Sequence, residues 1–279
     1  MVLLWDLSGK CPEYLKGDSI NTANGIKSLN YGIVARSGET VCQDAVCVNE
    51  TAGKYAVADG VSTSFFPKIF AEKLVNEFCL DEADNDCLYD ENTFQQWLAR
   101  PQGEWYEEVS RITKDLPDSK WHITKSFLSG EPAGSTLVGL EMISSEKPSK
   151  YRGVIIGDSC FFHIRDGQIF RSYLVKDSEA FGNFTESFAS YANIFDYNPS
   201  CFEDTVELGD ILVLGTDKIS EWIFKHSEAL PGKWKRCLRW LRNFSQGKYD
   251  LENFVKNARN AVTDIELVND DVGLIVMTF

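Results

Sequence analysis

Four short apolar runs, each meeting an aspartate, constrain the fold of this chain more than any other feature. The runs are residues 55–58 before Asp59, 154–156 before Asp158, 211–214 before Asp217, and 274–277 after Asp270 and Asp271. Such short runs, rich in β-branched and aliphatic residues and bounded by Gly or Asp, indicate buried strands rather than helices. If the last strand is antiparallel to its neighbours, its start and the other strands' ends share one sheet edge, where the carboxylates converge.

The rest of the pattern predicts antiparallel strands with helices packed on them. Residues 160–173, CFFHIRDGQIFRSY, have two β-rich arms around Asp166-Gly167, a dipeptide suited to a tight hairpin turn. Residues 67–80, 104–114 and 251–262 carry apolar side chains at helical spacing, which predicts amphipathic helices. Because no repeat or Pro/Gly/Ser-rich linker divides the chain, we expect one domain, 1–279, of the α+β class.

The charge balance argues against several classes of partner. The chain has 42 acidic and 28 basic residues, a formal charge of -14, which repels nucleic acid and anionic membranes. Its apolar start, residues 1–5, lacks a basic flank and is too short for a secretory signal or a membrane span. We therefore expect a cytoplasmic protein that binds neither nucleic acid nor membrane.

Histidine and cysteine chemistry are not indicated. The histidines, His122, His163 and His226, form no metal-ligand pair and adjoin no nucleophile motif. The eight cysteines lack a Cys-x-x-Cys pair, and in a chain of 279 residues they indicate neither a disulfide framework nor structural zinc. We interpret most of them as small buried apolar residues.

The aspartates at the predicted strand ends suit divalent cations. Mg²⁺ and Mn²⁺ prefer carboxylate, carbonyl and water oxygens, and Asp59, Asp217 and Asp270 suffice for a two-metal centre. Such a centre lowers the pKa of a bridging water and neutralises charge on a phosphoryl group. Any one strand-end aspartate is more often a cap or a turn residue, so this interpretation depends on all four sites together.

Six blocks in order along the chain resemble the metal-dependent protein serine/threonine phosphatases of the PPM type, also called protein phosphatase type 2C. The blocks are CQDA (42–45), VADGV (57–61), AGSTL (133–137), IGDSCFFHIRDG (156–167), GDILVLGTD (209–217) and NDDVGLIVM (269–277). The resemblance implies a four-layer αββα sandwich of two antiparallel β-sheets flanked by helices, in a divergent, bacterial-type branch. It also implies two or three Mn²⁺ or Mg²⁺ ions, a phosphorylated protein substrate and a monomer.

The same resemblance implies roles for individual residues. Asp59 looks like the carboxylate that bridges two metals, with the Gly60 carbonyl beside it. Asp217 and Asp270 look like ligands of one of those metals. Together with Asp44, which resembles the acid that holds metal-bound waters, Asp59 and Asp217 are the expected catalytic residues.

The expected sites include a weaker one, and some positions depart from the family pattern. Asp158 resembles a ligand of a third metal, with a turn residue as the open alternative. Glu39 stands where many members have a phosphate-binding arginine, so Arg36 is the candidate substitute, unless it is a solvated surface residue. Lys218 replaces the usual Gly and either contacts substrate phosphate or points to solvent.

Two further expectations remain. Residues 176–205 correspond to the family's variable flap. The departures at Glu39 and Lys218 favour one alternative, a catalytically impaired pseudophosphatase that serves as a binding module. A two-carboxylate glycosidase has only unordered aromatic residues in its favour.

Overall fold

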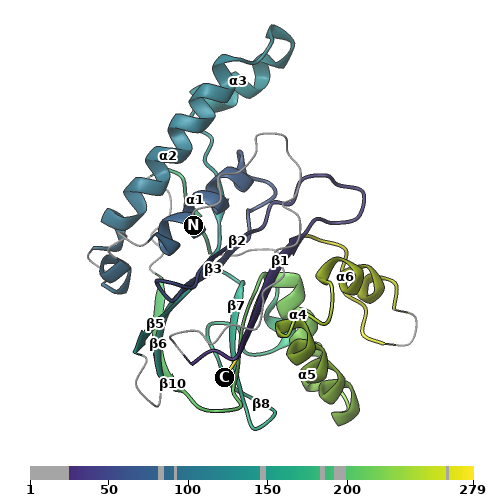
Figure 1. Ribbon diagram of the computed structural model, residues 1–279. Helices are drawn as coiled ribbons and strands as arrows, with labels where there is room; N and C mark the ends of the chain where they lie inside the picture. Colours follow the sequence, from purple (N-terminus) through teal and green to yellow (C-terminus); the bar gives the residue numbers. More distant parts are fainter. Residues whose placement is uncertain are drawn as a thin grey trace.

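Two five-stranded antiparallel sheets stack face to face, with helices on their outer faces (Figure 1). The computed structural model describes residues 25–80, 85–90, 93–144, 149–182, 186–191, 199–261 and 264–279. The first sheet has the order β1 (Ser28–Val34), β12 (Val272–Thr278), β11 (Ile211–Gly215), β7 (Cys160–Arg165) and β8 (Gln168–Ser172). The second has the order β10 (Ser200–Val206), β6 (Ser149–Ile156), β5 (Leu137–Ser144), β3 (Lys54–Ala58) and β2 (Ala45–Asn49).

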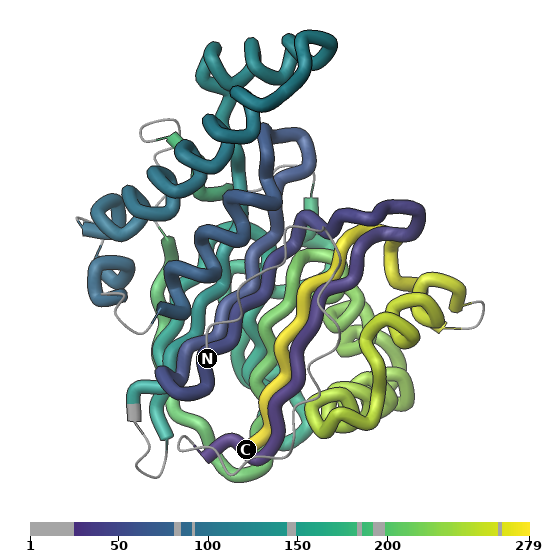
Figure 2. The backbone as a smooth tube through the Cα atoms, turned by 45° about the horizontal axis from the view of Figure 1, so that its top comes forward, coloured from purple at the N-terminus to yellow at the C-terminus, as the bar shows by residue number. Residues whose placement is uncertain are grey.

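Each sheet is covered by its own set of helices. The second sheet packs against α1 (Pro67–Cys79), which packs on α2 (Phe94–Lys114). The short η1 (Asn85–Tyr89) precedes α2, and η2 (Asp118–Lys120) joins α2 to α3 (Trp121–Leu128). Together α2 and α3 form an arm that projects from the sandwich in Figure 2. The first sheet packs against α4 (Asp217–Glu228), α5 (Pro231–Ser245) and α6 (Leu251–Arg259). The predicted αββα sandwich of the α+β class is therefore confirmed.

Strand alternation explains the layers. In β3, Tyr55 and Val57 point into the apolar layer between the two sheets, whereas Ala56 and Ala58 point toward α1. Because both faces of the strand are buried, its sequence is almost continuously apolar. Complete burial of a large apolar side chain contributes about 1.5–3 kcal/mol, so these layers supply most of the stabilisation.

The strands and the hairpin form as predicted. All four apolar runs lie in strands, and β12 is antiparallel to both neighbours, so the segments near the two ends of the described chain lie side by side (Figure 2). Asp166 and Gly167 join β7 to β8 with φ values of 51° and 72°. Positive φ at both central residues is the type I′ pattern that fits the strand twist.

The predicted helices differ at their ends. The helix over 67–80 is confirmed as α1, whose Pro67 lies in the first turn, where its missing N–H costs nothing. The helix expected at 104–114 begins earlier, at Phe94, and contains Pro101. Phe94, Trp97 and Leu98 extend its buried face, and this packing outweighs the local cost of the proline, about 3 kcal/mol. The third helix ends at Arg259, and residue 262 lies outside the described residues.

The expected flap, 176–205, is partly regular structure. It contains η3 (Ser178–Ala180) and β9 (Phe188–Ala189), which pairs with β4 (Gly134–Ser135). Its last residues belong to β10, the edge strand of the second sheet, which the sequence analysis did not predict. Residues 183–185 and 192–198 lie outside the described residues.

No helix within the described ranges combines the length and the apolar character that a bilayer span requires.

Candidate metal centre

The sheet topology brings the strand-end aspartates to one edge of the sandwich. Both β3 and β6 are antiparallel to β5, so they run in the same direction and end near the same edge. In the other sheet, the end of β11 pairs with the start of β12, with Gly215 opposite Leu274. The predicted convergence of carboxylates from the two sheets therefore occurs.

Asp59 lies at the centre of this group. It follows β3 directly, and its backbone N–H donates to the Thr136 hydroxyl at 2.9 Å. Burial raises the pKa of Asp59 well above its usual range, and the negative charges of Asp217, Asp158 and Asp270 raise it further. The carboxylates from both sheets thus act on one another electrostatically.

Asp44 is the most buried of the predicted site aspartates. Its side chain is 2 % exposed, and its Oδ2 has no hydrogen-bond partner among the residues that the structure describes. Burial raises its pKa well above the usual range, as do the charges of Asp59, Asp271 and Asp217, while the Thr216 hydroxyl lowers it. A buried carboxylate oxygen without a donor is costly unless a proton or a cation satisfies it.

Asp217 begins α4 and already has a counter-ion. Burial raises the pKa of Asp217 to about 6, although the neighbouring Lys218 ammonium lowers it. The Lys218 Nζ lies 2.5 Å from Asp217 Oδ2, and the Lys218 backbone N–H donates to Oδ1 at 2.5 Å. Lys218 therefore points toward the aspartates and not into solvent, and it partly neutralises them.

Asp158 and Asp270 complete the set that the sequence analysis predicted. Asp158 lies in the turn between β6 and β7, after Gly157, whose φ is +94°. Asp270 Oδ1 accepts the Asp271 N–H at 3.0 Å, just before β12. Both are half-buried and close enough to raise the pKa of Asp59.

Gly60 is required where it stands. A Cβ at this position would lie 2.9 Å from the Gln43 carbonyl oxygen and 3.0 Å from Pro67 Cβ. The Gly60 backbone forms an isolated bridge to Ser135. Only glycine permits this close approach of the segments that carry Asp44 and Asp59.

The Arg36 side chain does not point toward the aspartates. Its guanidinium pairs with Glu39 at 3.4 Å, and its side chain is 42 % exposed. Its backbone N–H, in contrast, donates to Asp271 Oδ1 at 2.7 Å. The arrangement favours the surface alternative for the Arg36 side chain.

Three residues that were not predicted hold the site together. The Asp271 carboxylate accepts the N–H groups of Arg36 and Gln43, and so fixes the segment that leads to Asp44. The Thr136 hydroxyl contacts Ser159 Oγ at 2.7 Å as well as the Asp59 N–H. The Thr216 hydroxyl accepts the Gly273 N–H at 2.9 Å. These residues lie within the blocks that carry the family resemblance. Residue type alone, however, does not distinguish a metal ligand from a residue that stabilises the backbone.

The donor set fits a hard divalent cation. Its atoms are carboxylate and backbone oxygens, which Mg²⁺ and Mn²⁺ prefer, and Asp44 Oδ2 lacks a partner in the described part of the chain. Within the described ranges, no group of three or more His, Cys, Asp or Glu side chains is positioned to hold one metal ion. The match is therefore one of donor type, and the carboxylates influence one another through their charges.

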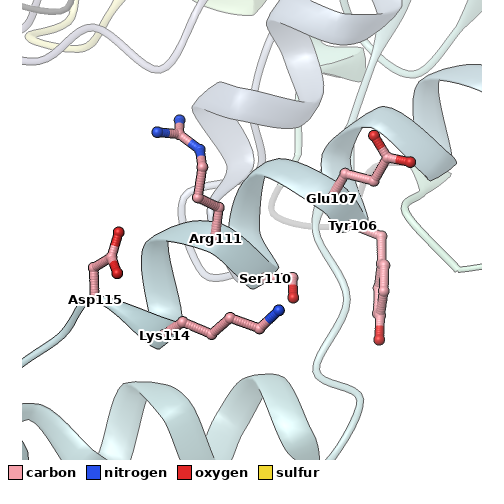
Figure 3. Close-up of a pocket in the computed structure, with 6 residues that line it drawn as sticks. All are labelled: Tyr106, Glu107, Ser110, Arg111, Lys114 and Asp115. Carbon is pink, nitrogen blue, oxygen red and sulfur yellow. The ribbon is translucent and has the colours of Figure 1, made fainter.

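A separate hollow on α2 is not part of this centre (Figure 3). Its volume is about 290 Å³, and it is lined by Tyr106, Glu107, Ser110, Arg111, Lys114 and Asp115. It carries charges of both signs and none of the predicted site residues.

This fold, two stacked antiparallel sheets with helices on their outer faces, is similar to that of PPM-type protein serine/threonine phosphatases. The structure is similar to the serine/threonine phosphatase PstP/Ppp of Mycobacterium tuberculosis, with a TM-score of 0.51 and 15% identity over 90% of this chain and 99% of that one. It is also similar to the photosystem II phosphatase PBCP, with a TM-score of 0.50 and 17% identity over 90% of this chain and 98% of that one.

A third structure is the PPM Ser-Thr phosphatase MsPP of Mycobacterium smegmatis, with a TM-score of 0.47 and 16% identity over 91% of this chain and 99% of that one. No protein-family model matches the sequence, and the curated proteins contain no significant match. At these identities the likeness establishes the fold.

Proposed function

We propose that this protein hydrolyses phosphoserine or phosphothreonine in proteins with the help of divalent cations. The observation that carries the proposal is the position of buried Asp44 beside Asp59, with an oxygen that lacks a partner in the described residues, on the edge where both sheets end. The PPM-type fold supports it, since the edge is formed by segments from both sheets.

Each residue at the edge has a distinct task in this proposal. Asp59, Gly60, Asp217 and Asp270 would hold two ions, Mn²⁺ or Mg²⁺, and Asp158 would hold a third. Bound ions would supply positive charge for the phosphoryl group and lower the pKa of a water molecule.

The remaining residues act on water and substrate. Asp44 would accept hydrogen bonds from water through its unpartnered Oδ2 and orient that water. The Lys218 ammonium, beside Asp217, would add positive charge for an anionic substrate. Arg36 would contact substrate only if its side chain leaves Glu39, so it is the weaker of the two substrate-binding candidates.

The cellular setting belongs to the same proposal. We infer one phosphatase domain over 1–279, monomeric and cytoplasmic, that acts on phosphorylated proteins. The formal charge of -14 supports only the exclusion of nucleic acid and anionic membranes as partners, because it repels them.

The test is hydrolysis of p-nitrophenyl phosphate and of a phosphothreonine peptide with Mn²⁺, with Mg²⁺ and with EDTA. Asp59→Asn and Asp217→Asn should each lose metal-dependent turnover, while Asp166→Asn, at the β7–β8 hairpin, should retain it. Full activity in both site variants would refute the proposal. Metal binding without turnover in the folded protein would instead indicate the alternative, a catalytically impaired pseudophosphatase.

A further inference from the structure

Two thiols far apart in the sequence meet at the edge of the second sheet. The Cys79 Sγ, at the end of α1, donates to the Cys47 carbonyl at 3.4 Å, and Cys47 lies in the middle of β2. The two thiols are also close enough for Cys79 to lower the pKa of Cys47. Alternation along β2 points Cys47, like Ala45, toward the helix layer, where α1 lies along the strand (Figure 1).

Two further contacts fix the position of the helix end that carries Cys79. Asn49 Nδ2 donates to the Cys79 carbonyl at 2.8 Å, and Lys54 Nζ donates to the Leu80 carbonyl at 2.7 Å. Both donors come from β2 and β3. The end of α1 is therefore held against the edge of the sheet, which keeps Cys79 beside β2.

The two thiols differ in the way that a reactive and a resolving cysteine differ. Cys47 is half-buried, whereas Cys79 is 4 % exposed. The adjacent Cys79 thiol lowers the pKa of the Cys47 thiol, and the Val48 N–H acts in the same direction, while burial opposes both. Burial raises the pKa of Cys79, although the Lys54 ammonium opposes that rise. Since the thiolate is the nucleophile, Cys47 is the first site of attack.

We propose that Cys47 and Cys79 form a redox-active pair that closes to an intramolecular disulfide when the protein meets hydrogen peroxide. The inference is independent of the proposed phosphatase activity. It requires only the juxtaposition of β2 and the end of α1.

The reaction balances with peroxide as the oxidant. The Cys47 thiolate attacks one peroxide oxygen, the O–O bond breaks, and Cys47 sulfenic acid and hydroxide form. The Cys79 sulfur then attacks the Cys47 sulfur, the S–O bond breaks, and the disulfide and water form. Two electrons leave the sulfur atoms, and each peroxide oxygen ends in water.

The disulfide would join the edge strand to the helix that covers it. It closes a loop over the 32 positions between the two cysteines, which restricts the unfolded chain. Cys47 lies three positions after Asp44, on the strand that follows it, so the cross-link also reaches the segment that enters the candidate metal centre.

The experiment treats the purified full-length chain with hydrogen peroxide, blocks free thiols with an alkylating reagent and maps peptides without reduction. We expect a Cys47–Cys79 linked peptide, a mass loss of about 2 Da and reversal by dithiothreitol. The melting temperature of the oxidised protein should rise by about 5 °C.

Variants separate the roles of the two cysteines. Cys79→Ser should leave a Cys47 sulfenic acid that dimedone traps, and Cys47→Ser should leave Cys79 unmodified. Cys237→Ser, which removes a buried thiol on α5, is the matched control and should still form the link. Circular dichroism confirms that each variant is folded. The proposal is overturned if folded wild-type protein consumes peroxide at other cysteines without forming the link, or if Cys47 reacts no faster than Cys237.

Discussion

The Asp271 carboxylate accepts the backbone N–H of Gln43 at 2.6 Å and joins two segments 228 positions apart in the sequence. Its other oxygen accepts the Arg36 N–H at 2.7 Å. Replacement by Ala leaves both donors without this charged acceptor, so we expect Asp271→Ala to lower the free energy of unfolding by about 3 kcal/mol. Urea denaturation measures the change.

A matched acidic residue provides the control for Asp271. Glu266 is exposed and lies five positions earlier, so Glu266→Ala should change the free energy of unfolding by less than about 0.5 kcal/mol. Equal stability of the two variants would show that the Asp271 hydrogen bonds do not stabilise the fold.

Gly60 gives a steric prediction. In Gly60→Ala the new methyl group would lie 2.9 Å from the Gln43 carbonyl oxygen, and we expect a loss of about 1–3 kcal/mol. A methyl group added at Gly103 in α2 would meet no atom within 4 Å, so Gly103→Ala should instead stabilise the helix by about 0.5–1 kcal/mol. Thermal unfolding compares the two, and a neutral Gly60→Ala would contradict the close approach.

Lys218 competes with any cation at Asp217. The Lys218 ammonium donates to Asp217 Oδ2 and adds positive charge beside it, so its removal should favour a bound cation. We therefore expect Lys218→Met to tighten Mn²⁺ binding by about tenfold, measured by calorimetric titration. Lys225→Met, which removes an ammonium paired with Glu221 on the same helix, should leave the affinity unchanged. Unchanged or weaker Mn²⁺ binding in Lys218→Met would mean that the ammonium does not compete there.

His163 predicts a pH dependence of stability. It is buried in β7, where Nε2 donates to Asp210 at 2.7 Å and Nδ1 accepts from Tyr151 at 2.9 Å. Burial lowers the pKa of His163, so the unfolded chain binds this proton at a higher pH than the folded chain. The stabilisation is complete above the unfolded-state pKa of 6.5 and is lost as the pH falls below it.

Urea unfolding at pH 7.5 and pH 5.5 tests this dependence. Wild type should lose up to about 1 kcal/mol more than His163→Gln between the two pH values. His122→Gln, an exposed histidine on α3, should behave as wild type. The same loss in His163→Gln as in wild type would exclude His163 as the source.

Strands and the edge where they end were predictable from sequence because their signals are local. Runs of apolar residues bounded by Gly and Asp locate β3, β11 and β12. α2 was harder, because Pro101 is a local obstacle that only tertiary packing overrides. β10 gave no signal, since its side chains alternate irregularly between buried and exposed.

The different roles of neighbouring polar residues could not be predicted from the sequence. Asp270 and Asp271 are adjacent and chemically identical, yet only Asp271 accepts the backbone N–H groups of Arg36 and Gln43 among the hydrogen bonds of the described residues. The partners of Asp271 lie more than 200 positions away in the sequence. Likewise, Lys218 had two open orientations, and only its distance to Asp217 decides between them.

Because Asp59 follows a strand of one sheet and Asp217 follows a strand of the other, the thickness of the apolar layer between the sheets sets the spacing of these carboxylates. Val57 and Leu214 lie in that layer, two and three positions before Asp59 and Asp217. A change in side-chain volume at either position would change the distance between the Asp59 and Asp217 carboxylates. Interior substitutions would then change the spacing of the two carboxylates without contacting either of them.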